Sequence, residues 1–311
     1  MILLETPSQN WSSYELVDSG NGEKLERFGN FVLRRPEPKA LWDKSLSESR
    51  WMELCHTSFT PGAGFGKAGK EDSGVWNMHK AMPEQWTVPY LGADKDAGPR
   101  FTLRLGLTSF KHVGVFPEQA PNWDFIFRQI ISIRGAHARR GEKYSPKVLN
   151  LFAYTGAASL AARAAGAQVT HLDSVRQVVT WARNNMELSS LDNIRWIIED
   201  AFKFVVREAR RGNVYDAVML DPPAYGHGPD GERWKLDECL FDMLKACNLI
   251  LAPKDSFLLL NLYSNGYSAM LADSLVAAAF GTSGERSCGE LMLTDRAGRN
   301  LPLSVFSRLI R

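Results

Sequence analysis

Near the middle of the chain stands the stretch Val148-Leu149-Asn150-Leu151-Phe152-Ala153-Tyr154-Thr155-Gly156-Ala157-Ala158-Ser159. Apolar residues dominate its first five positions, which predicts a buried strand. The small residues after Gly156 favour a helix, and Gly156 itself lets the backbone turn sharply between the two. The stretch therefore predicts a strand, a tight turn and a helix in immediate succession.

Strands and helices continue to alternate after this unit. Strands are predicted at 148–152, 169–173, 194–198, 217–220 and 256–262, and helices at 123–140, 157–165, 175–188, 201–210, 235–251 and 269–280. Nearly continuous apolar strands separated by helices indicate a parallel sheet that is covered on both faces. We therefore expect an α/β domain with a mostly parallel, doubly wound sheet over residues 121–311.

Residues 1–120 are richer in Gly, Pro and Trp and carry short alternating runs. Phe31–Arg35 is one such run, and Phe101–Leu105 alternates apolar and polar residues as a half-buried strand does. A turn is predicted over Asp18–Gly22. The glycine-rich segment 61–70 lacks the Gly-Lys-Ser/Thr ending of a phosphate-binding loop, so a surface loop is expected there. Together these features predict a small β-rich N-terminal domain.

Composition leaves several classes of function open. The 311 residues are 44% hydrophobic and 23% charged with a net charge of +2, which neither demands nor excludes a nucleic-acid partner. Four cysteines contain no CxxC pair, so neither a zinc site nor a disulfide is expected, and Cys239 and Cys247 are interpreted as core thiols. The N-terminus lacks a signal-peptide pattern and no stretch of ~20 apolar residues occurs, which predicts a cytoplasmic protein.

Polar groups follow four successive strands at the edge where open α/β sheets bind ligands. The turn at 153–159 leads into a helix N-terminus that offers free N–H groups. Asp173, 17 residues beyond Gly156, can accept both hydroxyls of a ribose. Asp200-Ala201-Phe202 is placed to bind and sandwich an adenine, and Asp221–Tyr225 follows the fourth strand. The series predicts a nucleoside site, although a tight turn at Gly156 and a helix cap at Asp173 remain alternatives for each feature alone.

The nucleoside is expected to lack a pyrophosphate. A dinucleotide site has the pattern G-x-G-x-x-G, in which the extra glycines make room for the phosphates. Only Gly156 is present here. S-adenosylmethionine has a ribose and an adenine but carries a methionine tail in place of a pyrophosphate, and it is therefore the predicted cofactor.

The motif Asp221-Pro222-Pro223-Ala224-Tyr225 is the candidate catalytic element. Two prolines remove two N–H donors and fix two φ angles, so the turn presents only acceptors and can hold a planar N–H group beside a methyl donor. Tyr225 could stack on a base, a contact worth ~1–3 kcal/mol in nucleic-acid binders. The alternative is a strand-terminating loop. Residues 261–266 are expected to line the far wall of the pocket, with a solvated turn as the alternative.

These residues resemble class I methyltransferases that modify bases of large-subunit ribosomal RNA, in particular the cytosine-C5 and guanine-N7 enzymes. The resemblance covers about residues 111–265. It rests on 149–156, Asp173-Ser174, Asn184 or Asn185, Asp200-Ala201 and Asp221-Pro222-Pro223, and upstream on 114–119 and Asn122. A PUA-type RNA-binding module is not recognisable in the N-terminal part.

The resemblance implies a Rossmann-like class I methyltransferase fold and a role for each motif. The turn 152–156 would hold the methionine part of S-adenosylmethionine, Asp173 the ribose and Asp200-Ala201 the adenine. A Gln at the place of Gln119 helps to close over the cofactor in the family, and Asp221 would lie between cofactor and target. The candidate cofactor-binding residues are Gln119, Phe152, Ala153, Tyr154, Thr155, Gly156, Asp173, Ser174, Asp200, Ala201 and Asp221. The candidate catalytic residues are Asp221, Pro222, Pro223 and Tyr225, and no metal is expected.

One difference from the family bears on which atom of the base accepts the methyl group. The cytosine-C5 members attack the base with a thiolate carried just after the fifth strand, where this chain has no cysteine in residues 261–265. Carbon methylation needs covalent activation of the ring, whereas a nitrogen already carries a lone pair and needs only positioning. We expect a ribosomal RNA base methyltransferase that acts on nitrogen, with a protein or small-molecule methyltransferase as the alternative. The missing glycines disfavour a nucleotide-dependent oxidoreductase, and the intact series of strand ends disfavours an inactive binding module.

Overall fold

The computed structural model describes residues 1–63, 73–94, 96–263 and 266–311. Most of the glycine-rich segment 61–70, and Ser264 and Asn265 of the segment 261–266, lie outside the described residues. The elements in chain order are β1 (Ile2–Glu5), β2 (Tyr14–Gly20), β3 (Glu23–Phe28), β4 (Phe31–Pro36), α1 (Glu48–Leu54), β5 (Thr57–Pro61), β6 (Gly74–Met78), β7 (Gln85–Tyr90), β8 (Phe101–Gly106), the 3₁₀ turn η1 (Pro117–Gln119), α2 (Ala120–Arg139), β9 (Lys147–Leu151), α3 (Ala157–Ala164), β10 (Gln168–Asp173), α4 (Arg176–Leu188), β11 (Ile194–Ile198), α5 (Ala201–Arg210), β12 (Ala217–Leu220), β13 (Tyr225–His227), β14 (Arg233–Lys235), α6 (Leu236–Asn248), β15 (Phe257–Tyr263), α7 (Ala269–Phe280), β16 (Glu285–Thr294) and β17 (Asn300–Ile310).

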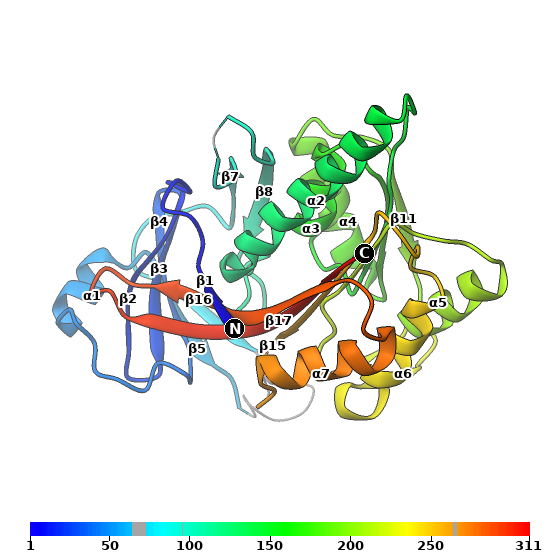
Figure 1. The fold of residues 1–311 in the computed structure, drawn as a ribbon. Helices are drawn as coiled ribbons and strands as arrows, with labels where there is room; N and C mark the ends of the chain where they lie inside the picture. Colours follow the sequence, from blue (N-terminus) through cyan, green and yellow to red (C-terminus); the bar gives the residue numbers. More distant parts are fainter. Residues whose placement is uncertain (64–72, 95, 264–265) are drawn as a thin grey trace.

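A central sheet of eight strands has the order β1-β16-β17-β15-β12-β9-β10-β11 (Figure 1). The strands from β15 to β11 are mutually parallel, whereas β17 runs antiparallel to both β15 and β16. The order reverses beside β9, since β10 and β12 lie on its two sides. Ligands of open α/β sheets bind at such a switch point, beyond the carboxyl ends of the strands. The predicted mostly parallel sheet is confirmed.

Alternate strand residues feed two separate cores on the two faces of this sheet. Val148 and Met219 pack into the core that contains residues of α2 and α3. Their chain neighbours Leu149 and Leu220 pack into the other core, with residues of α5, α6 and α7. Because side chains along a strand alternate between faces, strands buried on both sides must be apolar throughout. This explains the nearly continuous apolar runs in the sequence and confirms that helices cover both faces.

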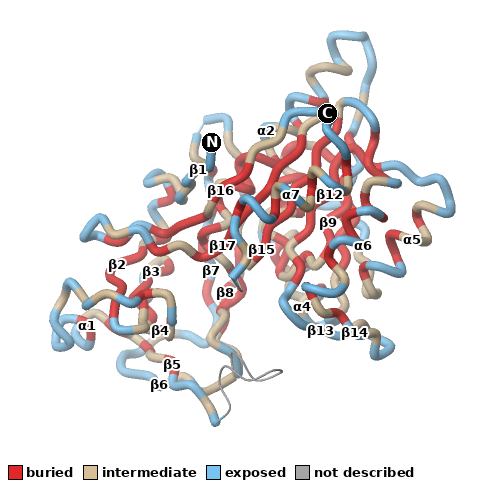
Figure 2. Tube along the Cα trace, turned by 60° about the horizontal axis from the view of Figure 1, so that its bottom comes forward, coloured by how far each residue is buried: buried red, intermediate tan, exposed pale blue. Residues whose placement is uncertain are grey.

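The N-terminal part contains a second sheet, β2-β3-β4-β5-β6, and the hairpin β7–β8. The predicted β-rich N-terminal domain is therefore confirmed. Its core is continuous with one face of the central sheet, because the Trp11 ring lies 5.0 Å from Tyr90 and 5.7 Å from Trp123 of α2. Figure 2 shows buried residues along both the N-terminal strands and the central strands. The N-terminal part of the chain and one face of the central sheet therefore share one hydrophobic core.

The predicted turn over Asp18–Gly22 is wrong in its first three residues, because β2 continues to Gly20. Asp18 is completely buried, and its carboxylate accepts hydrogen bonds from the Trp51 indole at 2.6 Å and the Leu46 N–H at 2.9 Å. A residue type that is typical of turns serves here as a buried anchor for α1. Only Asn21 and Gly22 form the turn.

The hairpin of β16 and β17 lies beyond the last predicted element, which ended at residue 280. It inserts the antiparallel β17 beside β15, and β1 then pairs in parallel with β16. The first strand of the chain therefore belongs to the central sheet. The short hairpin β13–β14 was also not predicted.

Candidate active site

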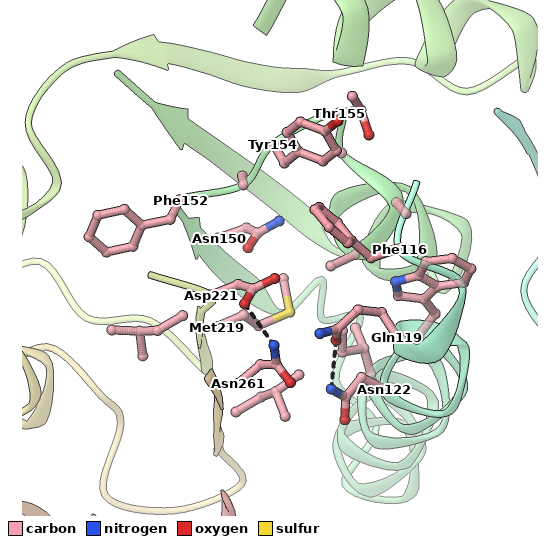
Figure 3. Close-up of a pocket in the computed structure, with 18 of the residues that line it drawn as sticks. Phe116, Gln119, Asn122, Asn150, Phe152, Tyr154, Thr155, Met219, Asp221 and Asn261 are labelled. Carbon is pink, nitrogen blue, oxygen red and sulfur yellow. Dashed lines mark hydrogen bonds between the residues drawn. The ribbon is translucent and has the colours of Figure 1, made fainter. Parts of the chain in front are cut away.

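A pocket of about 570 Å³, measured out to its open mouth, lies at the carboxyl ends of β9, β12 and β15 (Figure 3). One wall is the turn between β9 and α3, and the opposite wall comes from η1 and the start of α2. It is lined by Val115, Phe116, Gln119, Asn122, Trp123, Ile126, Asn150, Phe152, Ala153, Tyr154, Thr155, Gly156, Ala157, Ala158, Met219, Leu220, Asp221, Leu259 and Asn261.

The β9–α3 turn has an unusual backbone. Phe152 and Tyr154 have φ angles of 56° and 50°, and Gly156 has a φ of 92°. The left-handed region costs a non-glycine residue roughly 1–2 kcal/mol, so two such residues in one turn store strain. Strain of this kind persists only where neighbouring groups hold the backbone in place.

Three hydrogen bonds that involve side chains help to hold the turn. The Asp173 carboxylate accepts the N–H of Tyr154 at 2.9 Å, and the Asn185 Nδ2 donates to the Thr155 carbonyl at 2.9 Å. The Thr155 hydroxyl donates to the Gly114 carbonyl at 2.7 Å. Asn185 also accepts the backbone N–H of Arg104 in β8 at 2.8 Å, so the N-terminal part of the chain helps to fix the turn.

The polar residues inside β9 and β10 have partners beneath the pocket. Asn150 Nδ2 donates to the Ser159 hydroxyl at 2.9 Å, and that hydroxyl lies 3.0 Å from Nδ1 of His171. Burial lowers the pKa of His171 to about 3, so the ring is neutral at physiological pH. The network ties the end of β9 to the first turn of α3.

The N-terminus of α3 is suited to an anion. Gly156 occupies the N-cap position and supplies no side chain to bond the first N–H groups of the helix. Ala157 and Ala158, which follow it, line the pocket. The first N–H groups of any helix lack partners within the helix and carry its positive dipole end. A carboxylate in the pocket could therefore bind them.

At the ends of β12 and β15 the pocket is lined by two side chains that carry hydrogen-bond acceptors, Asp221 and Asn261. Asn261 Nδ2 donates to the Asp221 carboxylate at 2.7 Å, and burial raises the pKa of Asp221 to about 6. Asn261 is 2% exposed, and its Oδ1 has no hydrogen-bond partner among the described residues. A buried oxygen without a partner costs about 1–3 kcal/mol, which an N–H donor bound in the pocket would recover.

Seven of the predicted site residues line this pocket: Gln119, Phe152, Ala153, Tyr154, Thr155, Gly156 and Asp221. Asp173 lies directly behind the turn, where it bonds Tyr154, and burial raises its pKa. Asp200 is the N-cap of α5, and its side chain accepts the Lys203 N–H at 2.8 Å. Ser174 and Ala201 do not line the pocket.

The remaining catalytic candidates lie beside the pocket rather than in its wall. Pro222 is buried, and the Pro223 carbonyl accepts the Trp234 indole N–H at 2.7 Å, which links the Pro-Pro turn to β14. Tyr225 is 37% exposed on β13, with its hydroxyl 3.2 Å from Nε2 of His227. The Arg233 guanidinium carbon lies 5.9 Å from the centre of the Tyr225 ring.

The pocket also contains apolar side chains to which the sequence assigned no role: Trp123, Ile126, Met219 and Leu259. They belong to predicted helices and strands, where apolar residues are indistinguishable from core. Asn150 and Asn261 are polar residues inside otherwise apolar strands. This interruption of the apolar pattern is the feature of the sequence that marks them as candidate pocket residues.

The donor and acceptor sets fit S-adenosylmethionine. A methionine end carries a carboxylate and an ammonium group, which need donors and acceptors respectively. The α3 N-terminus supplies donors, and the unpartnered Asn261 Oδ1 supplies an acceptor. Met219 and Leu259 provide an apolar surface between them.

No group of three or more His, Cys, Asp and Glu side chains is arranged to hold a metal ion within the described ranges. No helix in the same part of the chain is long and apolar enough to cross a membrane.

Comparison with known proteins identifies the class of enzyme. Residues 131–253 match the family model of S-adenosylmethionine-dependent methyltransferases. The crystal structure of a SAM-dependent methyltransferase from Agrobacterium tumefaciens is 37% identical, with a TM-score of 0.86, over 99% of this chain and 93% of that one.

Two curated relatives are similar over shorter segments. Ribosomal RNA large subunit methyltransferase K/L of Shewanella frigidimarina is 27% identical over 172 residues, which are 54% of this chain and 22% of that protein. Ribosomal RNA large subunit methyltransferase I of Klebsiella pneumoniae is 28% identical over 125 residues, 35% of this chain and 31% of that protein. The chain spans less than a third of the length of these curated relatives. The predicted class of enzyme and its cofactor are confirmed by the family match and the full-length structural relative: the chain belongs to the S-adenosylmethionine-dependent methyltransferases.

Proposed function

We propose that this methyltransferase modifies a base of ribosomal RNA and that the acceptor atom is a nitrogen. The observation that carries the proposal is the half-buried Asp221 carboxylate, which stands at the end of the pocket with one oxygen bonded to Asn261. The names of the two curated relatives, both of which are ribosomal RNA large subunit methyltransferases, support RNA as the substrate class.

Asp221 would bind and orient the acceptor nitrogen. Its Oδ1 is bonded to Asn261, so Oδ2 is available to accept an N–H of the target base. S-adenosylmethionine, when bound, supplies a methyl group on a positively charged sulfur. The nitrogen lone pair forms the new bond to carbon as the carbon–sulfur bond breaks, and Asp221 can accept the proton that the nitrogen then loses. The rigid Pro222-Pro223 turn fixes the carboxylate relative to the pocket.

The distribution of cysteines supports a nitrogen rather than a ring carbon as acceptor. None of the four cysteines, all of which belong to the described part of the chain, lines the pocket. Burial raises the pKa of Cys55, Cys247 and Cys288, which disfavours their thiolate forms. A thiolate that attacks the ring is the step that carbon methylation needs, and the pocket offers no such nucleophile.

We assign the adenosine half of the cofactor to the strand ends next to the pocket. The Asp173 carboxylate at the end of β10, with Ser174 beside it, would accept the ribose hydroxyls. Asp200 and Ala201 at the end of β11 would contact the adenine. The β10 and β11 ends lie on the side of the β9–α3 turn that is opposite to β12, which leaves Asp221 for the target.

The hairpin β13–β14 would contact the RNA. It carries the exposed Tyr225, His227 and Arg233 directly after the Pro-Pro turn. An exposed aromatic ring with a histidine and a guanidinium group near it is suited to stacking on an unpaired base.

Transfer of a tritiated methyl group from S-adenosylmethionine to undermodified ribosomal RNA tests the proposal, with Asp221→Ala as the inactive control. Mass spectrometry of the product nucleosides identifies the acceptor atom. Incorporation at a base nitrogen is expected, whereas incorporation at carbon, or into no RNA at all, contradicts it. RNA affinity that is absent or insensitive to salt would favour the alternative of a protein or small-molecule substrate, because phosphate contacts make binding weaker in salt.

A further inference from the structure

Figure 3 shows Asn122 bonded to Gln119 on one wall of the pocket, and Asn122 is also bonded to Arg308, which forms an ion pair with Glu5. Asn122 Nδ2 donates to Oε1 of Gln119 at 2.8 Å. On the other side, Oδ1 of Asn122 accepts from Nε and Nη2 of Arg308 at 3.2 Å and 2.7 Å. Asn122 is 1% exposed and Arg308 is 4% exposed, so solvent water cannot replace these hydrogen bonds.

Arg308 itself is held rigidly. Its Nη1 and Nη2 donate to the two carboxylate oxygens of Glu5 at 2.9 Å and 2.6 Å. Its guanidinium carbon lies 4.0 Å from the ring centre of Phe306 and 4.5 Å from that of Phe125. A bidentate pair between two aromatic faces leaves the guanidinium little freedom to rotate.

These contacts determine which atom of Gln119 enters the pocket. A guanidinium has only donors, so the Asn122 atom that faces it must be the amide oxygen. The amide nitrogen of Asn122 must then face Gln119, where it requires an acceptor, which is Oε1. The remaining atom of the Gln119 amide is Nε2, and it is available to donate to a ligand in the pocket.

A donor at this place is suited to the carboxylate of a bound amino acid. The Gln119 wall and the α3 N-terminus both present N–H groups to the pocket, whereas Asp221 and Asn261 present acceptors. We propose that Glu5, Arg308 and Asn122 are positioning residues that fix Gln119 as a hydrogen-bond donor to the carboxylate of S-adenosylmethionine. The inference rests on the proposed role of the pocket as the methionine site and is independent of the RNA substrate.

The substitution Asn122→Asp separates this role from simple packing. The new carboxylate keeps the contact with Arg308 but has no N–H to donate, so Gln119 must turn its Nε2 towards residue 122 and its oxygen towards the pocket. Affinity is measured by calorimetry for S-adenosylhomocysteine, which has the amino-acid end, and for 5′-methylthioadenosine, which lacks it. We expect a roughly 10- to 100-fold loss for S-adenosylhomocysteine and a change of less than about twofold for 5′-methylthioadenosine.

A double-variant cycle controls for the added negative charge. Gln119→Met removes the proposed donor at a partly exposed position and is expected to lower the affinity for S-adenosylhomocysteine by a similar factor. In that background Asn122→Asp should have less than about a twofold further effect. An equal loss for both ligands, or an undiminished effect in the Gln119→Met background, overturns the inference. Failure of the wild-type protein to bind S-adenosylhomocysteine would instead contradict the role of the pocket itself.

Discussion

The Asp221 carboxylate and the Asn261 amide, 40 residues apart in the chain, are joined by a 2.7 Å hydrogen bond at the ends of the neighbouring strands β12 and β15. The bond leaves one oxygen of each side chain for a ligand. It also lowers the pKa of Asp221, but burial outweighs it and raises that pKa to about 6. Because its pKa is about 6, the Asp221 side chain changes its protonation state close to neutral pH.

Methyl transfer should depend on pH through Asp221. Only the carboxylate form can accept an N–H from the target base and take up its proton. We expect kcat/KM to rise as pH increases through about 6 and then to level off. A rate profile between pH 5 and pH 8 measures this, and a rate that does not change across pH 6 would contradict a role for the carboxylate.

Asp221→Asn should stabilise the fold at neutral pH while it reduces transfer. The folded pKa of about 6 exceeds the ordinary value of 3.8, so the folded state binds this proton more tightly than the unfolded state does. The stability gained from it is fully present below the ordinary pKa and is lost as pH rises through about 6.

The charge on Asp221 therefore costs stability at pH 8, and we expect Asp221→Asn to increase the free energy of unfolding there by about 1–3 kcal/mol. At pH 4 the gain should be small. Transfer should fall by roughly 10²- to 10⁴-fold. Urea unfolding at the two pH values checks the sign, and a variant less stable than wild type at pH 8 would count against it.

Gly156→Ala should weaken both the fold and the cofactor site. Gly156 has a φ of 92°, and a Cβ there would lie 3.1 Å from the Cβ of Ala182 in α4. We expect a loss of roughly 2–3 kcal/mol in the free energy of unfolding, together with weaker binding of S-adenosylhomocysteine. Gly212→Ala is the matched control, because its φ of 68° imposes similar strain but nothing lies within 4 Å. That control should lose about 1 kcal/mol and bind the cofactor normally.

Asp173→Ala should weaken the binding of both ligands of the calorimetric test. The ribose is common to S-adenosylhomocysteine and 5′-methylthioadenosine, so loss of its acceptor should weaken both by roughly 10- to 100-fold. The tie to the Tyr154 N–H is also lost. Selective loss of S-adenosylhomocysteine alone would place the ribose elsewhere.

Replacement of the cysteines should leave the chemistry intact. We expect Cys239→Ser together with Cys288→Ala to retain transfer within about threefold, since neither residue lines the pocket. Cys55→Ala and Cys247→Ala are each tested alone, because both side chains are fully buried and their truncation costs stability. RNA that contains 5-fluorocytidine should form no covalent adduct with the wild-type enzyme, as judged by denaturing gel electrophoresis.

Apart from the short hairpin β13–β14, the strand and helix pattern of residues 147–280 was predictable from the sequence because both faces of the sheet are buried. Burial on two sides makes each strand a short apolar run, and polar residues then mark its end. The helix 201–210 and the strand 217–220 were predicted with the bounds that the structure gives. The turn predicted at Asp18–Gly22 was wrong in its first three residues. An aspartate that is buried by long-range contacts cannot be distinguished in the sequence from one in a turn.

The sequence by itself determined the alternation of strands and helices, the single-glycine turn at Gly156, and the order in which Asp173, Asp200 and Asp221 follow their strands, because these depend on local backbone and side-chain periodicity. Only the tertiary structure decided that β16, β17 and β1 complete the sheet, that Asp221 meets Asn261, and that Glu5 and Arg308 stand behind Asn122 and Gln119. These relationships join residues up to 303 positions apart. They depend on strand order and on complementary donors and acceptors in the folded core, which no local pattern encodes.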